Sequence, residues 1–248
     1  MKCCFAEACQ NRFVLVDALD QEYVEDVVLE NAHEILIREQ RDDVLVLYHG
    51  TGKSLKMMVY GADKQLGEFC GNGALGAAAY LFKTYCQHEP FYLETPYGFV
   101  DLMKQEDGTF SLRLPPVRLL LNPQFVRKQQ LFGLHYVEMM EPHLVMEGQL
   151  SDEELFMMGR KINAHKDIFP LGINVNAFHV LGENRLFVKT YERGVQRLTK
   201  ACGSGSIACA AFSKKEGQLF VSTPGGELEI FLNKDSILLK GAASFCDI

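Results

Sequence analysis

The sequence predicts an α+β fold made of two similar domains, each a mostly antiparallel sheet or barrel around a central helix, related by a pseudo-twofold axis. Short segments rich in β-branched and aromatic residues recur along the chain, which is typical of strands. Few segments have helical spacing, and one unit of sequence occurs in both halves. A chain of 248 residues is long enough for two domains of about 120 residues each.

The first half of the chain contains several predicted strands and one long predicted helix. A helix is predicted over Asp20–Arg38, where Val24, Val27, Val28 and Ile35 recur at compatible spacing. The strands are indicated by their β-branched and aromatic residues. They are Phe13–Asp17, Val44–Tyr48, Lys56–Tyr60, Phe91–Glu94 and Phe110–Leu114.

A proline-containing break separates the two halves. Leu114–Val117 contains two consecutive prolines, and a further proline follows at Pro123. We therefore expect a first domain over residues 1–117 and a second over residues 118–235. A C-terminal strand over residues 236–248 is expected to return to the first domain.

The second half begins with a predicted helix and continues in strands. Ser151–Glu154 has the composition of a helix N-terminus and leads into Leu155–Ile162. The strands predicted after this helix are Asn174–Leu181, Arg185–Tyr191, Gln218–Ser222, Glu227–Leu232 and Ser236–Leu239.

The repeated unit consists of a Cys-Gly-x-Gly motif, a helix of small residues and a strand entered through Thr-Pro-x-Gly. Around residue 70 the chain reads CGNGALGAAAY, and around residue 202 it reads CGSGSIACAAF. The strand entries are ETPYGFVDL at 94–102 and STPGGELEI at 222–230. The upstream strands that begin at Asn11 and Asn174 echo one another as well, so we interpret them as corresponding strands of the two halves.

Composition excludes several classes of function. The net charge of −7 and the pI near 5.5 argue against a nucleic-acid partner, which requires a basic face. No basic run or long apolar stretch indicates a membrane, and no signal peptide precedes the first strand. We therefore expect a cytoplasmic protein whose eight cysteines are reduced. They form no Cys-x-x-Cys pair, so no metal site is expected.

The stretch Gly50–Ser54 resembles the end of a phosphate-binding P-loop. A complete motif requires a glycine where this chain has Leu47, and a helix rather than a predicted strand after Ser54. We interpret the stretch as a plain turn and expect no nucleotide cofactor.

The two cysteines of the repeated unit, Cys70 and Cys202, have the surroundings of reactive thiols. Glycines let the backbone approach a ligand closely, and the amides of a helix's first turn form an anion site. A helix N-terminus stabilises a thiolate, so we expect each pKa to lie below its usual value of about 8.5. Two such sites across a cleft between the domains would hold a carboxylate with one thiol on each face of its α-carbon. This arrangement can invert a stereocentre without a cofactor.

Several motifs together identify a family resemblance. They are CGNGA at 70–74, Tyr191–Gly194, ACGSG at 201–205, Pro224–Gly226, Asn11-x-Phe-Val, Pro142-His143, Phe169-Pro170 and Asn174-Val175. In these motifs, and over essentially its whole length, the chain closely resembles the diaminopimelate epimerases. The resemblance implies interconversion of LL- and meso-diaminopimelate, in lysine and peptidoglycan biosynthesis, on a small amino-acid substrate with no cofactor or metal. A homodimer is left open.

The resemblance also implies roles for individual residues. Cys70 and Cys202 would be the two bases, with His143 and Glu192 near the thiols to assist proton transfer. The reacting carboxylate would be held by the backbone amides of Gly71, Asn72, Gly203 and Ser204. The rest of the substrate would be bound by Asn11, Asn174 and Arg193, and Arg193 would anchor the distal carboxylate.

Two departures from the family pattern concern recognition of the distal group of the substrate. Gly61 and Glu141 stand where the family has asparagines. A site that lacks distal polar groups rejects shorter substrates less strongly. The sequence therefore predicts weaker discrimination against glutamate than in a typical diaminopimelate epimerase. A related racemase of altered substrate range and a binding protein without turnover remain as alternatives.

Overall fold

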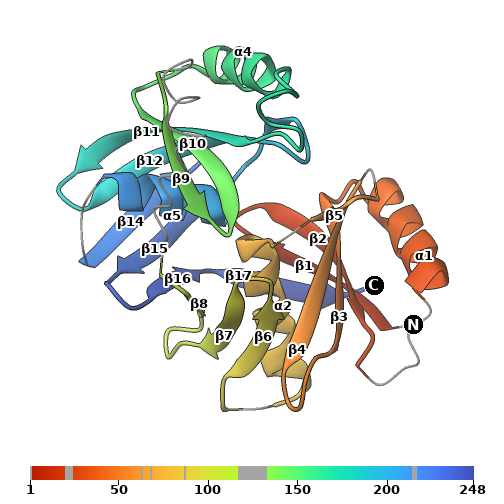
Figure 1. Ribbon diagram of the computed structural model, residues 1–248. Helices are drawn as coiled ribbons and strands as arrows, with labels where there is room; N and C mark the ends of the chain where they lie inside the picture. The colour runs from red at the N-terminus through yellow and green to blue at the C-terminus, as the bar shows by residue number, and fades with distance from the viewer. Residues whose placement is uncertain are drawn as a thin grey trace. The chain divides into compact units, whose positions relative to one another are not determined.

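The computed structural model describes residues 2–19, 25–62, 64–67, 69–86, 88–116, 133–213 and 217–248. The chain divides into two compact units (Figure 1). Unit 1 comprises Met1–Pro115 and Leu238–Ile248, and unit 2 comprises Pro116–Ile237. The predicted domain boundary after Val117 lies outside the described residues, as do residues 20–24 of the predicted first helix.

Unit 1 is a mixed sheet in which antiparallel pairs predominate. β1 (Lys2–Ala8) pairs antiparallel with β2 (Asn11–Asp17) and with the C-terminal β17 (Ala243–Asp247). β2 runs parallel to β3 (Asp43–His49), and β3 pairs antiparallel with β4 (Leu55–Gly61). The remaining strands are β5 (Leu66–Gly67), β6 (Phe91–Thr95), β7 (Gly98–Lys104), β8 (Phe110–Leu114) and β16 (Ile237–Gly241).

The helix α2 (Gly71–Thr84) forms the core of unit 1. It packs against β1, β2, β7, β8 and β17. Every residue from Gly71 to Phe82 is buried. A helix enclosed on all sides must be made of small and apolar residues, which is the composition of this stretch. The other helix of the unit, α1 (Glu25–Arg38), contacts β2 and β3.

Unit 2 repeats this arrangement around the helix α5 (Gly203–Phe212), which contacts β9, β10, β11, β12, β14 and β15. The helix α4 (Asp152–Asn163) begins at Ser151 with a capping box to Glu154 and packs on β11, β12 and β13. The strands are β9 (His135–Met139), β10 (Glu141–Glu147), β11 (Asn174–Gly182), β12 (Arg185–Glu192), β13 (Arg197–Leu198), β14 (Gly217–Thr223) and β15 (Gly226–Leu232).

The two units share one order of elements and one set of strand pairings. The parallel pairs β2–β3 and β4–β6 of unit 1 correspond to β10–β11 and β12–β14 of unit 2. The antiparallel pair β3–β4 likewise corresponds to β11–β12. The predicted α+β class of two similar sheet domains, each around a central helix, is confirmed.

One detail of the predicted repeat is wrong. By pairing, the counterpart of β2, which begins at Asn11, is β10, which begins at Glu141; the strand that begins at Asn174 corresponds to β3. The echo between Asn11 and Asn174 pairs strands that do not correspond, because the sequence pattern does not predict β9 and β10 as strands. Their sequences contain a proline and a histidine, which weaken the strand pattern.

The P-loop-like stretch Gly50–Ser54 connects β3 to β4 as a turn. The backbone amide of Thr51 and the hydroxyl of Ser54 both donate to the carboxylate of Glu94. The donors that a bound phosphate would need are therefore already bonded to a carboxylate of β6. Among the described residues, no helix has the length and hydropathy that a membrane crossing requires.

Candidate active site

The two repeated cysteines occupy the same local geometry in their respective units. Cys70 is the N-cap of α2 and Cys202 is the N-cap of α5, with backbone angles (φ, ψ) of −128°, 109° and −128°, 113°. The amide of Gly73 donates to Sγ of Cys70 at 3.2 Å, and the amide of Gly205 donates to Sγ of Cys202 at 3.4 Å. Both thiols thus take the place that a serine or aspartate oxygen usually has at a helix start.

The N-cap contacts determine which backbone amides in the first turn of each helix are hydrogen-bonded within it. The third helical residue donates to sulfur, and the fourth donates to the N-cap carbonyl in the ordinary helical way. The amides at the first two positions stand outside the helical ladder. They belong to Gly71 and Asn72 in α2 and to Gly203 and Ser204 in α5, the residues expected to hold a carboxylate.

The second glycine of each motif has little space around it. A Cβ on Gly205 would lie 2.4 Å from Oδ1 of Asn176 and 3.0 Å from Oγ1 of Thr190. A Cβ on Gly73 would lie 2.9 Å from a terminal methyl of Leu45. A side chain at Gly205 would displace polar groups of the strands beneath α5, whereas at Gly73 it would meet only the flexible end of Leu45.

The expectation of a lowered thiol pKa is wrong for Cys202. Burial raises the pKa of the Cys202 thiol well above its usual value, and the negative charges of Glu192 and Glu141 raise it further. The hydrogen bonds from Ser204 and from the Gly205 amide favour the thiolate but do not offset the loss of solvent. Cys202, only 8% exposed, therefore rests as a neutral thiol.

In unit 1, the start of α2 is joined to the start of β2. The side-chain amide of Asn72 donates to Oδ1 of Asn11 at 2.7 Å. Asn72 is buried and Asn11 is partly buried. The structure thus places the Asn11 side chain against the first turn of α2, the turn that Cys70 caps.

In unit 2, His143 is fully buried on β10 and held by Asn176 of β11. Nδ2 of Asn176 lies 3.2 Å from Nδ1 of His143 and donates to the carbonyl of Leu144 at 3.0 Å. The hydroxyl of Thr190 donates to Oδ1 of the same asparagine at 2.9 Å. Because the Leu144 carbonyl can only accept, Nδ2 must face it, so Nδ1 of His143 accepts and the ring proton is on Nε2.

His143 is also neutral. Burial, together with the nearby positive charge of Arg193, lowers the pKa of His143 to about 3. Nε2 makes no hydrogen bond of ordinary geometry within the described residues. The ring is therefore a fixed N–H donor rather than an exchangeable acid at neutral pH.

We predict that nitrogen NMR will show His143 as the neutral Nε2–H tautomer from pH 5 to 9. Asn176→Asp should move the proton to Nδ1 and raise the pKa of His143, because a carboxylate accepts where the amide donated. Thr190→Ser keeps the donor to Asn176 and serves as the control. A His143 that titrates near its usual pKa in the unaltered protein would contradict this assignment.

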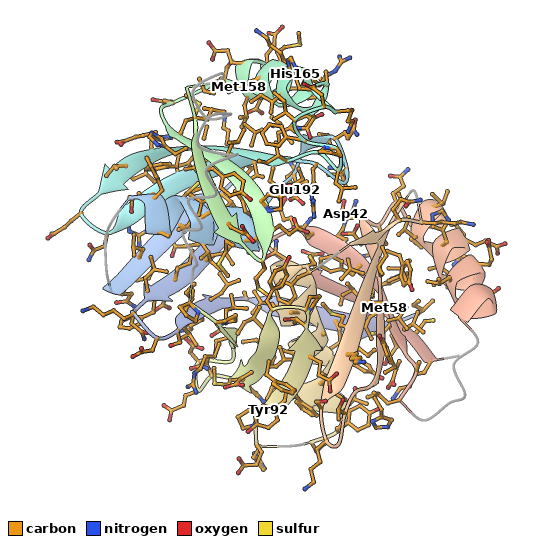
Figure 2. All side chains as sticks on the ribbon, viewed as in Figure 1. Asp42, Met58, Tyr92, Met158, His165 and Glu192 are labelled. Carbon is orange, nitrogen blue, oxygen red and sulfur yellow. The ribbon has the colours of Figure 1, made fainter. Side chains whose placement is uncertain are left out.

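Glu192, labelled in Figure 2, is the last residue of β12. Its negative charge acts on the Cys202 thiol. Its carboxylate accepts a hydrogen bond from the hydroxyl of Thr199, and its carbonyl accepts from the amide of Gln196 in the turn that follows. Thr199 is buried, so this bond orients the carboxylate.

The remaining predicted residues of unit 2 form one polar cluster. Nδ2 of Asn174 donates to Oε2 of Glu141 at 2.9 Å, and Oδ1 of Asn174 accepts from the backbone amide of Arg193 at 3.0 Å. The guanidinium of Arg193 lies 3.5 Å from Oε1 of Glu141. Asn174 is buried; it orients the Glu141 carboxylate and holds the backbone of Arg193, while its predicted direct contact with substrate stays a prediction.

The supporting residues Asn176, Thr190 and Thr199 were not singled out from the sequence. A signal for Asn176 existed, because it lies two residues after Asn174 on one strand and therefore on the same face. Thr190 and Thr199 carry no such signal, since their side-chain partners Asn176 and Glu192 are distant in the sequence pattern.

Comparison with known proteins extends these observations. Residues 136–246 match the family model of diaminopimelate epimerase. A hydroxyproline epimerase from Agrobacterium vitis, solved with bound trans-4-hydroxy-L-proline, shares the fold with a TM-score of 0.68 at 13% identity, over 100% of this chain and 90% of its own. The fold is that of the amino-acid racemases and epimerases, and the prediction that the chain is an isomerase is confirmed.

The particular resemblance is to the diaminopimelate epimerases. The enzyme of that name from Thermotoga maritima is 29% identical over 95% of this chain and 96% of its own. That from Methanothrix thermoacetophila is 29% identical over 94% of this chain and 89% of its own. The family resemblance predicted from the motifs is confirmed.

Proposed function

We propose that the protein is a diaminopimelate epimerase that interconverts LL- and meso-diaminopimelate by a two-cysteine, cofactor-independent proton transfer. The observation that carries the proposal is the equivalence of Cys70 and Cys202. Each is the N-cap of a buried helix in one of two units of the same topology, with matching backbone angles and sulfur contacts.

In the proposed reaction, one cysteine as thiolate breaks the Cα–H bond and takes the proton. The electron pair passes into the carboxylate, and the other cysteine as thiol delivers its proton to the opposite face. The amides of Gly71, Asn72, Gly203 and Ser204 stabilise the added charge on the carboxylate, because helix N-termini favour anions. The two thiols exchange protonation states in each turnover.

The protonation of Cys202 fits the donor half of this scheme. Its raised pKa keeps it a thiol before substrate binds, which is the form that the scheme requires of the cysteine that delivers the proton. His143 and Glu192 then have different tasks from each other. Neutral His143 holds the polar network behind the site in one arrangement, while the Glu192 carboxylate favours the protonated form of Cys202.

The test is α-proton exchange in deuterated water, followed by proton NMR on a panel of amino acids. LL- and meso-diaminopimelate should exchange and interconvert, and glutamate, aspartate and proline serve as comparison substrates. If α-proton exchange occurs only in another amino acid, the protein is a related racemase and not a diaminopimelate epimerase. Binding of diaminopimelate without exchange would support a binding protein.

A further inference from the structure

Non-glycine residues with a left-handed backbone gather at one edge of the sheet of unit 1. Cys9 and Gln10 (φ 49° and 61°) form the turn before β2. Gln40 (φ 51°) precedes β3, and Lys64 (φ 63°) follows β4. Because β2 runs parallel to β3 and β3 antiparallel to β4, these places lie at the same edge. A side chain strains this backbone region, and such strain is concentrated at functional sites.

The turn between β1 and β2 has two such residues in succession. Ala8 pairs with Asn11 across the hairpin, so Cys9 and Gln10 form a two-residue loop with positive φ at both positions. A loop of this kind usually contains asparagine and glycine, which tolerate the left-handed region. Neither residue is glycine here, so the chain keeps a backbone conformation that its own side chains disfavour.

The two residues of this turn have different surroundings. Cys9 is half-buried, and burial raises the pKa of its thiol to about 11, so its side chain packs against the protein as a neutral group. Gln10 is exposed. A substitution of Gln10 therefore changes the backbone preference of the turn without removing a packed side chain.

The residue that leaves the turn is Asn11, and it is held on both sides. Its Oδ1 accepts the side-chain amide of Asn72, in the first turn of α2, at 2.7 Å. The backbone amide of Arg12 donates to Oδ2 of Asp42 at 2.8 Å, and the carbonyl of Arg12 accepts from the amide of Asp42 at 2.7 Å. Asn11 thus lies between a restricted turn and a fastened strand, which holds its side chain at the start of α2.

We propose that Gln10 is a positioning residue, which as a non-glycine restricts the turn between β1 and β2 and so holds Asn11 against Asn72. This inference rests on the proposed function, in which the first turn of α2 holds the reacting carboxylate. Glycine adopts more backbone conformations than any other residue, so at this position it would make other turns available and release Asn11. A displacement of about 1 Å at such a place can lower a reaction rate about 100-fold.

The experiment replaces Gln10 and measures the melting temperature together with kcat and KM for α-proton exchange of LL-diaminopimelate. Gln10→Gly should raise the melting temperature by about 2–4 °C, because glycine relieves the left-handed strain. It should nevertheless lower kcat/KM about tenfold, mainly through kcat, because the helix start that Asn11 supports stabilises the developing charge. Gln10→Asn should retain the activity, because asparagine tolerates this region and is more restricted than glycine.

Cys86→Gly is the matched control. Cys86 is also an exposed non-glycine residue with a left-handed backbone (φ 50°), but it follows the opposite end of α2 from Cys70. Its replacement by glycine should raise the melting temperature by a similar amount and leave kcat/KM unchanged.

A purely structural role of the turn would make stability and activity change in the same direction. The inference is overturned if Gln10→Gly keeps the kcat/KM of the unaltered protein, or if its melting temperature falls together with its activity. An equal loss of activity in Cys86→Gly overturns it as well. Absence of exchange in the unaltered protein contradicts the proposed function instead, so the two failures are distinguishable.

Discussion

Epimerisation should fall by about 10³-fold or more when Cys202 is replaced by alanine, and equally when Cys70 is replaced. Each face of the α-carbon requires its own acid or base, so neither thiol can substitute for the other. Serine is a much weaker acid than cysteine, and Cys70→Ser and Cys202→Ser should therefore leave little activity. The measurement is the rate of LL-to-meso conversion, followed in both directions.

A half-reaction provides the control for these variants. A substrate analogue with a halide on the β-carbon needs only one base, because loss of the α-proton is followed by departure of the halide. Cys202→Ala, which keeps Cys70 as the base, should thus eliminate halide from one epimer of the analogue while failing to epimerise diaminopimelate. Robust epimerisation by folded Cys202→Ala would refute the two-base scheme.

The starts of the two buried helices could be predicted from the sequence because the signals that determine them are local. A glycine pair after a cysteine, followed by small residues, determines both the turn and the buried helix, and the structure has these features in α2 and α5. The capping box at Ser151 is local in the same sense. Such signals depend on neighbouring residues along the chain.

The protonation of the site could not be predicted in this way. The pKa of Cys202 depends on its burial and on Glu192 and Glu141, which reach it through strand pairing rather than through sequence proximity. The helix N-terminus alone favours a thiolate, whereas burial of the same sulfur disfavours it, and the larger effect is burial. The fixed tautomer of His143 likewise depends on Asn176 across a parallel pair.

The expected tolerance of glutamate depends on what replaced the family's asparagines. Gly61 removes a polar side chain, which by itself softens the rejection of shorter substrates. Glu141 instead adds a charge that lies 3.5 Å from Arg193 and is oriented by Asn174. The negative charge of Glu141 favours stronger rejection of a substrate that carries only a distal carboxylate. Comparing kcat/KM for glutamate in Gly61→Asn and in Glu141→Gln separates the two effects.

The second large effect is expected at Gly205. Gly205→Ala should lower the free energy of unfolding by about 3 kcal/mol, because overpacking of a buried site costs about this much. The new methyl group would lie 2.4 Å from Oδ1 of Asn176 and 3.0 Å from the hydroxyl of Thr190. Both atoms belong to the buried hydrogen-bond network of His143 and cannot move without breaking it.

The equivalent change in unit 1, Gly73→Ala, is the matched comparison and should cost about 1 kcal/mol or less. There the closest atom is a terminal methyl of Leu45 at 2.9 Å, which can turn away by a small side-chain rotation. Denaturant unfolding of both variants measures the difference. Shortening the obstructing side chain should also relieve Gly205→Ala, so the Asn176→Ala, Gly205→Ala double variant should lose less stability than the sum of the single variants. If Gly73→Ala and Gly205→Ala cost the same, or if the double variant is additive, the contact of Gly205 with Asn176 does not restrain the start of α5.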